Sequence, residues 1–103
     1  MKIQDLELHD ALVSKVEVEL GRISMFIKCY LEENSTKRDD LQIEFSGVRS
    51  SNLLMDHGAL LINGRAGNIN YWIPKNDGVT YIYLVDGFIS IDSQSISVVY
   101  QGP

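Results

Sequence analysis

Residues 79–100 read VTYIYLVDGFISIDSQSISVVY, and this stretch decides the fold. It is rich in β-branched and aromatic residues, which favour strands, and its only charged side chains are Asp86 and Asp92. An Asp-Gly pair between apolar runs is typical of a tight hairpin, because a type I′ turn needs positive φ at both central positions. The stretch therefore predicts a turn at Asp86-Gly87 that pairs Leu84 with Ile89.

A second turn, at Ser93-Gln94, is predicted to pair Ile91 with Ile96 and to complete a three-stranded meander. Period-two alternation places its most apolar side chains on one face: Ile82, Leu84, Ile89, Ile91, Ile96 and Val98. The opposite face holds Tyr81, Tyr83 and Phe88, and it is more apolar than a solvent-exposed surface usually is. We therefore expect that another part of the chain covers this face or that it forms a homodimer contact.

Alternation outside this stretch predicts further strands at residues 11–20, 22–31, 41–45 and 68–73. In the first, the inward residues are expected to be Leu12, Val16, Val18 and Leu20. In the last of these strands, Ile69, Tyr71 and Ile73 are expected to share a face. The turn between the first two strands falls either at Gly21-Arg22 or at Leu20-Gly21, and the second choice pairs Glu19 with Arg22.

Residues 50–58 have no clear period. A short helical turn capped by Ser50 or Ser51 and a plain loop both remain open. A short apolar run at residues 59–62 stops at Asn63-Gly64, another hairpin pair. Together the elements predict an all-β fold, or a β-rich α+β fold, in which an antiparallel meander of about seven strands forms a β-sandwich or an open barrel with at most one short helix.

Composition limits the class of protein. The chain has 103 residues and a net charge of −5, which predicts a single globular domain over residues 1–103. An acidic chain without a basic patch argues against nucleic-acid binding, and no apolar run is long enough for a membrane span. The only cysteine is Cys29, expected on an inward face as a small hydrophobe, so the chain suits a reducing compartment. We expect a cytoplasmic protein.

The two histidines each sit beside an aspartate, in His9-Asp10 and Asp56-His57. Four such groups suggest a metal site or an acid–base pair, which makes a small metal-binding protein or enzyme one alternative. However, adjacent strand residues point to opposite faces, and the spacing matches no ligand motif. We expect no catalytic, cofactor-binding or metal-binding residues, with Asp10 instead forming a turn that opens the first strand.

Three segments carry a resemblance to known proteins: residues 8–10 (LHD), residues 45–48 (FSGV) and the hairpin at residues 82–91. In these segments the chain resembles a group of small bacterial β-rich proteins that includes immunity proteins of polymorphic toxin systems. The resemblance implies a bacterial, cytosolic, non-enzymatic protein, possible partner contact at His9 and Asp10, and no particular toxin.

A binding role predicts acidic residues that steer a basic partner and a surface aromatic that anchors it. The candidate partner-binding residues are His9, Asp10, Glu32, Glu33, Asp39, Asp40, Tyr71 and Trp72. Of Tyr71 and Trp72, one is expected to pack in the core, because neighbouring strand residues point in opposite directions. A self-associating structural subunit that uses the Tyr81, Tyr83 and Phe88 face is a further alternative.

Overall fold

The computed structural model describes residues 3, 6–30, 38–55 and 68–102. These residues form antiparallel strands and contain no α-helix, as predicted. The strands are β1 (Leu12–Glu19), β2 (Arg22–Cys29), β3 (Asp39–Ser46), β4 (Ser50–Met55), β5 (Ile69–Ile73), β6 (Gly78–Leu84), β7 (Gly87–Ser93) and β8 (Ser95–Gly102).

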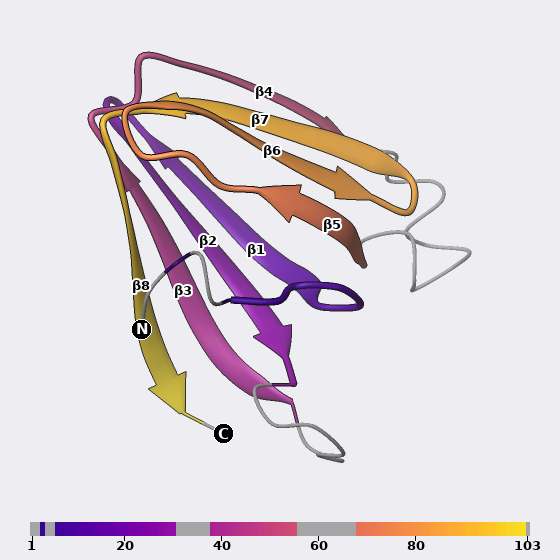
Figure 1. The fold of residues 1–103 in the computed structure, drawn as a ribbon. Coiled ribbons are helices and arrows are strands. Elements are labelled where there is room, and N and C mark those ends of the chain that lie inside the picture. The colour runs from indigo at the N-terminus through magenta and orange to yellow at the C-terminus, as the bar shows by residue number, and fades with distance from the viewer. Residues whose placement is uncertain (1–2, 4–5, 31–37, 56–67, 103) are drawn as a thin grey trace.

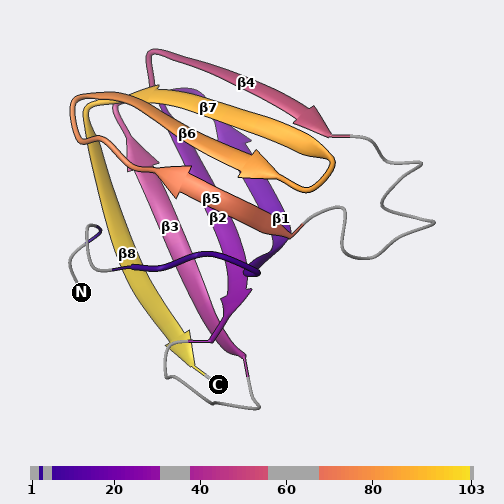
Figure 2. The ribbon, with the colours of Figure 1, turned by 45° about the vertical axis from the view of Figure 1, so that its right-hand side comes forward.

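The strands are arranged in two four-stranded sheets that pack as a β-sandwich (Figure 1). Sheet A has the order β1-β2-β3-β8, and sheet B has the order β4-β7-β6-β5. The sheets approach each other at the end where β3 leads to β4 and β7 leads to β8, and they diverge toward the opposite end. Figure 2 shows the segment before β1 crossing this wider end.

Alternate side chains of both sheets fill the core, as the period-two pattern predicts. The fully buried ones include Ile23, Met25, Ile27, Leu41, Ile43, Phe45, Ile82, Ile89 and Ile91. Leu8 in the segment before β1 is completely buried, and Leu6 and Ala11 are buried as well. This segment therefore supplies the apolar side chains that occupy the wider end between the sheets.

The β1–β2 turn falls at Leu20-Gly21, since Glu19 pairs with Arg22. Gly21 has a φ of 78°, a value that glycine adopts without strain. A register shift between Val13 and Lys15 changes which residues face inward in β1, so Val13 is buried in place of Leu12. The inward placement predicted for Leu20 is wrong, because it occupies the turn and is fully exposed.

Val18 pairs with the buried Ile23, yet 61% of its surface is exposed. It lies on the edge strand β1, at the end of sheet A near the turn. Its predicted burial is therefore wrong, although its side chain points to the same face of β1 as that of Val16, which packs against the core.

The β6–β7 turn falls at Val85-Asp86, one position earlier than predicted. Leu84 therefore pairs with Gly87, and Ile82 pairs with Ile89. This displaces the register by two residues, which keeps every side chain on its predicted face. Gly87 is required for a different reason than turn geometry: a Cβ atom there would lie 2.6 Å from the carbonyl oxygen of Leu54. Glycine permits this close approach of β4.

The hairpin predicted at Ser93-Gln94 is wrong. Instead of returning beside β7, β8 crosses to sheet A and pairs with β3, so that Ile96 lies opposite Phe45. The backbone N–H of Gln94 donates to the carbonyls of Ser46 (3.0 Å) and Gly47 (3.2 Å), which joins the two crossing connections. Both the β3–β4 and the β7–β8 connections change sheets at this corner.

Residues 50–55 form a strand, β4, and neither a helical turn nor a loop. Its backbone pairs with β7 over its whole length, although most of its side chains are exposed and it shows no core-facing pattern. In β5, a register shift between Ile69 and Tyr71 separates residues that were predicted to share a face. Ile69 is buried, whereas Tyr71 and Ile73 are about half exposed. The predicted run at residues 59–62 lies outside the described residues.

Candidate interaction surface

The outer face of sheet B carries two rows of side chains, because cross-strand partners point to the same side of a sheet. The register places Leu54, Phe88, Tyr83 and Tyr71 in one row that crosses all four strands. The next row holds Asn52, Ser90, Tyr81 and Ile73. We call the six apolar and aromatic members of these rows the aromatic face: Leu54, Tyr71, Ile73, Tyr81, Tyr83 and Phe88.

The rings of the aromatic face are packed against one another. Tyr71 stacks on Tyr83 with a centroid distance of 4.5 Å, and Tyr83 lies 5.2 Å from Phe88. Tyr81 lies 6.5 Å from Tyr83 and 6.0 Å from Phe88. These separations are in the range in which aromatic pairs attract. The rings therefore form a continuous, pre-ordered surface.

Exposure distinguishes this surface from the core. Leu54 is 70% exposed, Tyr71 51% and Ile73 50%, while Tyr83 and Phe88 are half-buried. None of the six side chains is charged. Next to Tyr71, where the row ends, lies an open hollow of about 340 Å³ lined by Ile3, Leu6, Glu7, Tyr71, Trp72 and Pro74. The face thus combines exposed apolar area with an adjacent depression.

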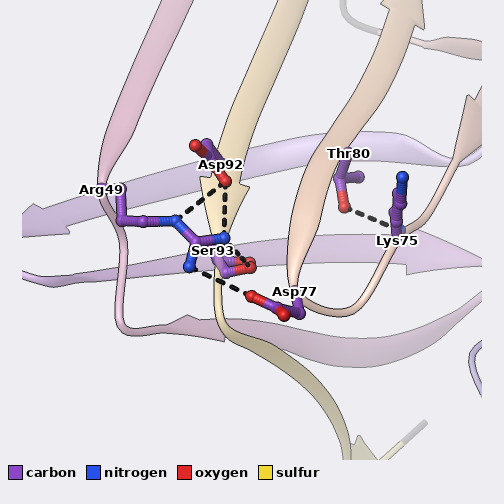
Figure 3. A network of polar contacts seen from close by, with 6 residues as sticks. All are labelled: Arg49, Lys75, Asp77, Thr80, Asp92 and Ser93. Atoms are coloured by element: carbon purple, nitrogen blue, oxygen red, sulfur yellow. Dashed lines mark hydrogen bonds and ion pairs between the residues drawn. The ribbon is translucent and has the colours of Figure 1, made fainter.

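Within the strands of sheet B the one charged residue is Asp92 of β7, and it is held by Arg49 at the corner of the sandwich (Figure 3). Arg49 Nη2 and Nε donate to Asp92 Oδ1 at 2.8 and 3.1 Å, Nη2 also donates to Ser93 O at 3.2 Å, and Nη1 donates to Asp77 Oδ1 at 3.1 Å. The hydrogen bonds that Arg49 donates to Asp92 and, to a smaller extent, to Asp77 raise the pKa of its guanidinium. Arg49 therefore has a structural role: it links the β3–β4 connection, where it lies, to the β5–β6 connection and to the end of β7.

His9 and Asp10 lie together in the turn before β1. Asp10 has a φ of 66°, and this turn brings His9 Nε2 within 3.5 Å of Asp10 Oδ2. The expectation that the two side chains diverge is wrong, because it assumed an extended backbone. His9 Nδ1 also donates to Asn70 O at 2.7 Å. This hydrogen bond and the nearby carboxylate of Asp10 raise the pKa of His9.

Asp10 lies in a turn before β1, as predicted, and the turn is closed by the Ala11 N–H, which donates to Leu8 O at 2.9 Å. The N–H of Asp10 itself donates to Ile69 O of β5 at 2.8 Å. Asp56 and His57 lie outside the described residues, so the structure does not place them beside His9. Within the part of the chain that the structure describes, no group of three or more His, Cys, Asp or Glu side chains is arranged to hold a metal ion.

Of the acidic candidates that the structure describes, Asp39 and Asp40 lie in β3 of sheet A, away from the aromatic face. Asp40 forms an ion pair with Lys28 of β2 at 2.8 Å, and Asp39 accepts a hydrogen bond from the Tyr100 hydroxyl at 3.0 Å. The partner of Asp40 is thus a cross-strand lysine and not its sequence neighbour Arg38, which donates to Asp10 O at 3.3 Å. Glu32 and Glu33 lie outside the described residues.

Tyr71 and Trp72 divide as predicted. Tyr71 is exposed on the aromatic face, whereas Trp72 packs against the core and donates from Nε1 to Leu6 O at 3.0 Å. Sequence reasoning missed Leu54 and Ile73 as members of this face. Ile73 was missed because the register shift in β5 changes which residues share a face. Leu54 was missed because residues 50–55 were not identified as a strand.

Cys29 is buried on the inward side of β2, as predicted. Loss of solvation raises the pKa of its thiol to about 11. At neutral pH this cysteine is therefore almost entirely protonated, and the protonated thiol is a poor nucleophile.

Comparisons with protein-family models, with curated proteins and with solved structures found no match. Among the described residues, none forms a helix with the length and apolar character needed to cross a bilayer.

Proposed function

We propose that this chain is a non-enzymatic binding protein that recognises a protein partner through the aromatic face of sheet B. In line with its resemblance to immunity proteins, we propose a toxin as the partner, which the bound protein blocks. The observation that supports this proposal best is an uncharged row of side chains that crosses all of sheet B: Leu54, Phe88, Tyr83 and Tyr71. Leu54 and Tyr71 are exposed, and Phe88 and Tyr83 are half-buried.

Tyrosine and other aromatic residues are enriched among the side chains that contribute most to binding energy. Here Tyr71, Tyr81, Tyr83 and Phe88 are already stacked before binding. Docking would therefore order few additional side-chain torsions, which lowers the entropic cost of association. The hollow beside Tyr71 offers a place for an anchoring side chain of the partner.

The size of the aromatic face fits the centre of an interface. Four strands spaced ~4.8 Å apart and two rows of side chains give an area of roughly 19 by 14 Å, or ~270 Å², and the aromatic face occupies six of its eight positions. A standard interface buries about 800 Å² on each partner, so polar residues around the patch would form its rim. The net charge of −5 would favour encounter with a basic partner.

The test uses purified candidate toxins, taken from the products of genes beside the gene for this protein. We expect one of them to bind with 1:1 stoichiometry in isothermal titration calorimetry. Tyr71→Ala and Phe88→Ala should each weaken binding by about 2 kcal/mol or more, which corresponds to roughly thirtyfold.

Tyr30→Ala is the matched control, since Tyr30 is 45% exposed and directly follows β2, a strand of the other sheet. Its affinity should equal that of the unsubstituted protein. Equal losses in all three variants would contradict the assignment of the surface. If no neighbouring toxin binds, the immunity-type role is wrong.

A further inference from the structure

The hollow beside Tyr71 is bounded by two segments that are distant in the sequence. One is the edge strand β5, and the other is the segment before β1, which runs along the free edge of β5. Trp72 Nε1 donates to Leu6 O at 3.0 Å. Asp10 N donates to Ile69 O at 2.8 Å. These hydrogen bonds hold the two walls together, and the volume of about 340 Å³ lies at the lower end of the range of ligand pockets.

The described residues that line the hollow supply one sign of charge. Glu7 is the only charged residue among the six, and neither lysine nor arginine is among them. Glu7 Oε1 accepts a hydrogen bond from the backbone N–H of His9 at 2.8 Å, which restricts the position of the carboxylate. The ring of His9 does not line the hollow and has its own carboxylate neighbour, Asp10 Oδ2, at 3.5 Å. The lining therefore favours a cationic ligand over an anionic one.

Two aromatic rings complete the lining chemistry. Tyr71 stacks on Tyr83 with 4.5 Å between the ring centroids, but Tyr83 does not line the hollow. The hollow therefore borders the part of the Tyr71 ring that Tyr83 leaves uncovered. The indole N–H of Trp72 is already donated to Leu6 O, so Trp72 offers a ligand its π system and not a hydrogen-bond donor. Cations are attracted to aromatic rings, and most strongly to tryptophan.

The outer face of sheet A shows how this protein already uses the same two groups. There Lys15 Nζ lies 5.4 Å from the centre of the Phe26 ring and 2.7 Å from Glu17 Oε1. One cation thus contacts a ring and a carboxylate together. In the hollow, rings and a carboxylate are again neighbours, but its described lining includes no lysine or arginine to contact them.

We propose that the hollow binds the guanidinium group of an arginine side chain of the protein partner. As an anchor for that partner, the arginine site rests on the proposed function, which it deepens by naming the side chain that enters beside the aromatic face. A guanidinium suits the lining better than an ammonium group, because it is planar and weakly hydrated and can stack on a ring while it donates to a carboxylate. The net charge of −5 attracts basic surfaces toward the site.

The test measures the binding of single side chains and does not need the partner. The probes are Nα-acetyl-arginine amide and Nα-acetyl-citrulline amide, which has nearly the same shape but no charge. Trp72 is the only tryptophan in the sequence, so its indole N–H gives one assignable NMR signal at the hollow. We expect the arginine probe to shift this signal saturably in the millimolar range, with an affinity about tenfold higher than that of the citrulline probe.

Glu7→Gln is the decisive variant. The glutamine carbonyl can still accept the hydrogen bond from His9 N–H, so the segment keeps its position while the charge is removed. Its affinity for the arginine probe should fall about fivefold, whereas its affinity for the citrulline probe should not change. Glu17→Gln is the matched control, since it removes the same charge from β1 in the other sheet, and it should bind the arginine probe as the unsubstituted protein does.

A third probe, Nα-acetyl-lysine amide, carries the same charge as the arginine probe without the planar group, and it should bind more weakly. An equally tight lysine probe, no saturable shift of the Trp72 signal, or equal effects of Glu7→Gln and Glu17→Gln would each overturn the arginine site.

The outcomes also separate the arginine site from the proposed function. A neighbouring toxin that binds through the aromatic face, together with equal affinities for the arginine and citrulline probes, would overturn the arginine site and leave the binding role intact. Arginine binding that depends on Glu7, without any neighbouring toxin that binds, would support the site and refute the immunity-type role.

Discussion

The turn at His9-Asp10 has a consequence for protonation. His9 Nδ1 donates to Asn70 O, and its other ring nitrogen lies 3.5 Å from an Asp10 carboxylate oxygen. Both contacts favour the charged imidazolium, so the pKa of His9 is raised above 6.5 in the folded protein. The sequence places the two residues side by side, but the contact depends on the positive φ of Asp10, which the residue types do not reveal.

His9 should therefore stabilise the fold more at acidic than at alkaline pH. A group whose pKa is raised by folding contributes its full stabilisation below the unfolded-state pKa, near 6.5, and loses it as the pH rises through the higher folded-state value. We expect the difference in unfolding free energy between the unsubstituted protein and His9→Gln to be larger at pH 5.5 than at pH 8.5. Urea denaturation at both values measures it, and a difference of opposite sign would contradict this assignment.

Single strands and their inward residues were largely predictable, because burial follows a period of two. β3 shows this most clearly: Leu41, Ile43 and Phe45 alternate in the sequence and are all buried. Register shifts were not predictable. The shift at Val13/Lys15 reverses the inward parity within a strand whose alternation appears regular, and the shift at Ile69/Tyr71 exposes Tyr71 on the outer face.

The β4–β7 pair depends on a glycine. A Cβ atom at Gly87 would meet Leu54 O at 2.6 Å, and a backbone atom cannot move without disturbing the pairing. We expect Gly87→Ala to lower the free energy of unfolding by about 1–3 kcal/mol, the usual cost of overpacking. Urea denaturation measures the loss.

Gly78→Ala is the control, since a Cβ atom there would meet only the flexible Lys75 side chain, at 2.7 Å. Its effect should stay within about 0.5 kcal/mol. If both alanine variants are equally stable, the close approach of Leu54 O does not explain the need for glycine at residue 87.

At the scale of the molecule, the sandwich was predictable but its connectivity was not. Short turns such as Ser93-Gln94 favour a return beside the preceding strand, whereas β8 continues into the other sheet. The crossing is fixed by contacts between distant residues, such as Arg49 with Asp77 and Asp92. The aromatic face was predictable in part, from Tyr81, Tyr83 and Phe88. Its continuation across β4 and β5 could be recognised only from the strand pairing in the structure.

The segment before β1 should act as a structural part of both sheets. Leu8 is completely buried, and Leu8→Ala should lower the free energy of unfolding by about 2–5 kcal/mol. The single tryptophan, Trp72, donates to Leu6 O, so its fluorescence reports on docking of this segment.

We expect the fluorescence and circular dichroism transitions of Leu8→Ala to coincide at lower urea concentration, as in two-state unfolding. Leu20→Ala, at a fully exposed turn residue, should stay within about 0.5 kcal/mol of the unsubstituted protein. A fluorescence change that precedes the loss of strand signal would show that the segment detaches by itself.

The crossing of β8 also affects the order of events during synthesis. β3 receives its second neighbour from a strand that a ribosome releases only after all of sheet B. Until then one edge of β3 is unpaired, because the residues that lie opposite Ile43 and Phe45 in β8, Val98 and Ile96, have not yet been released. The first three strands can pair with one another as they are released, but the edge of β3 that β8 occupies stays unpaired, so an interrupted translation product would carry an open edge strand that can pair with other chains.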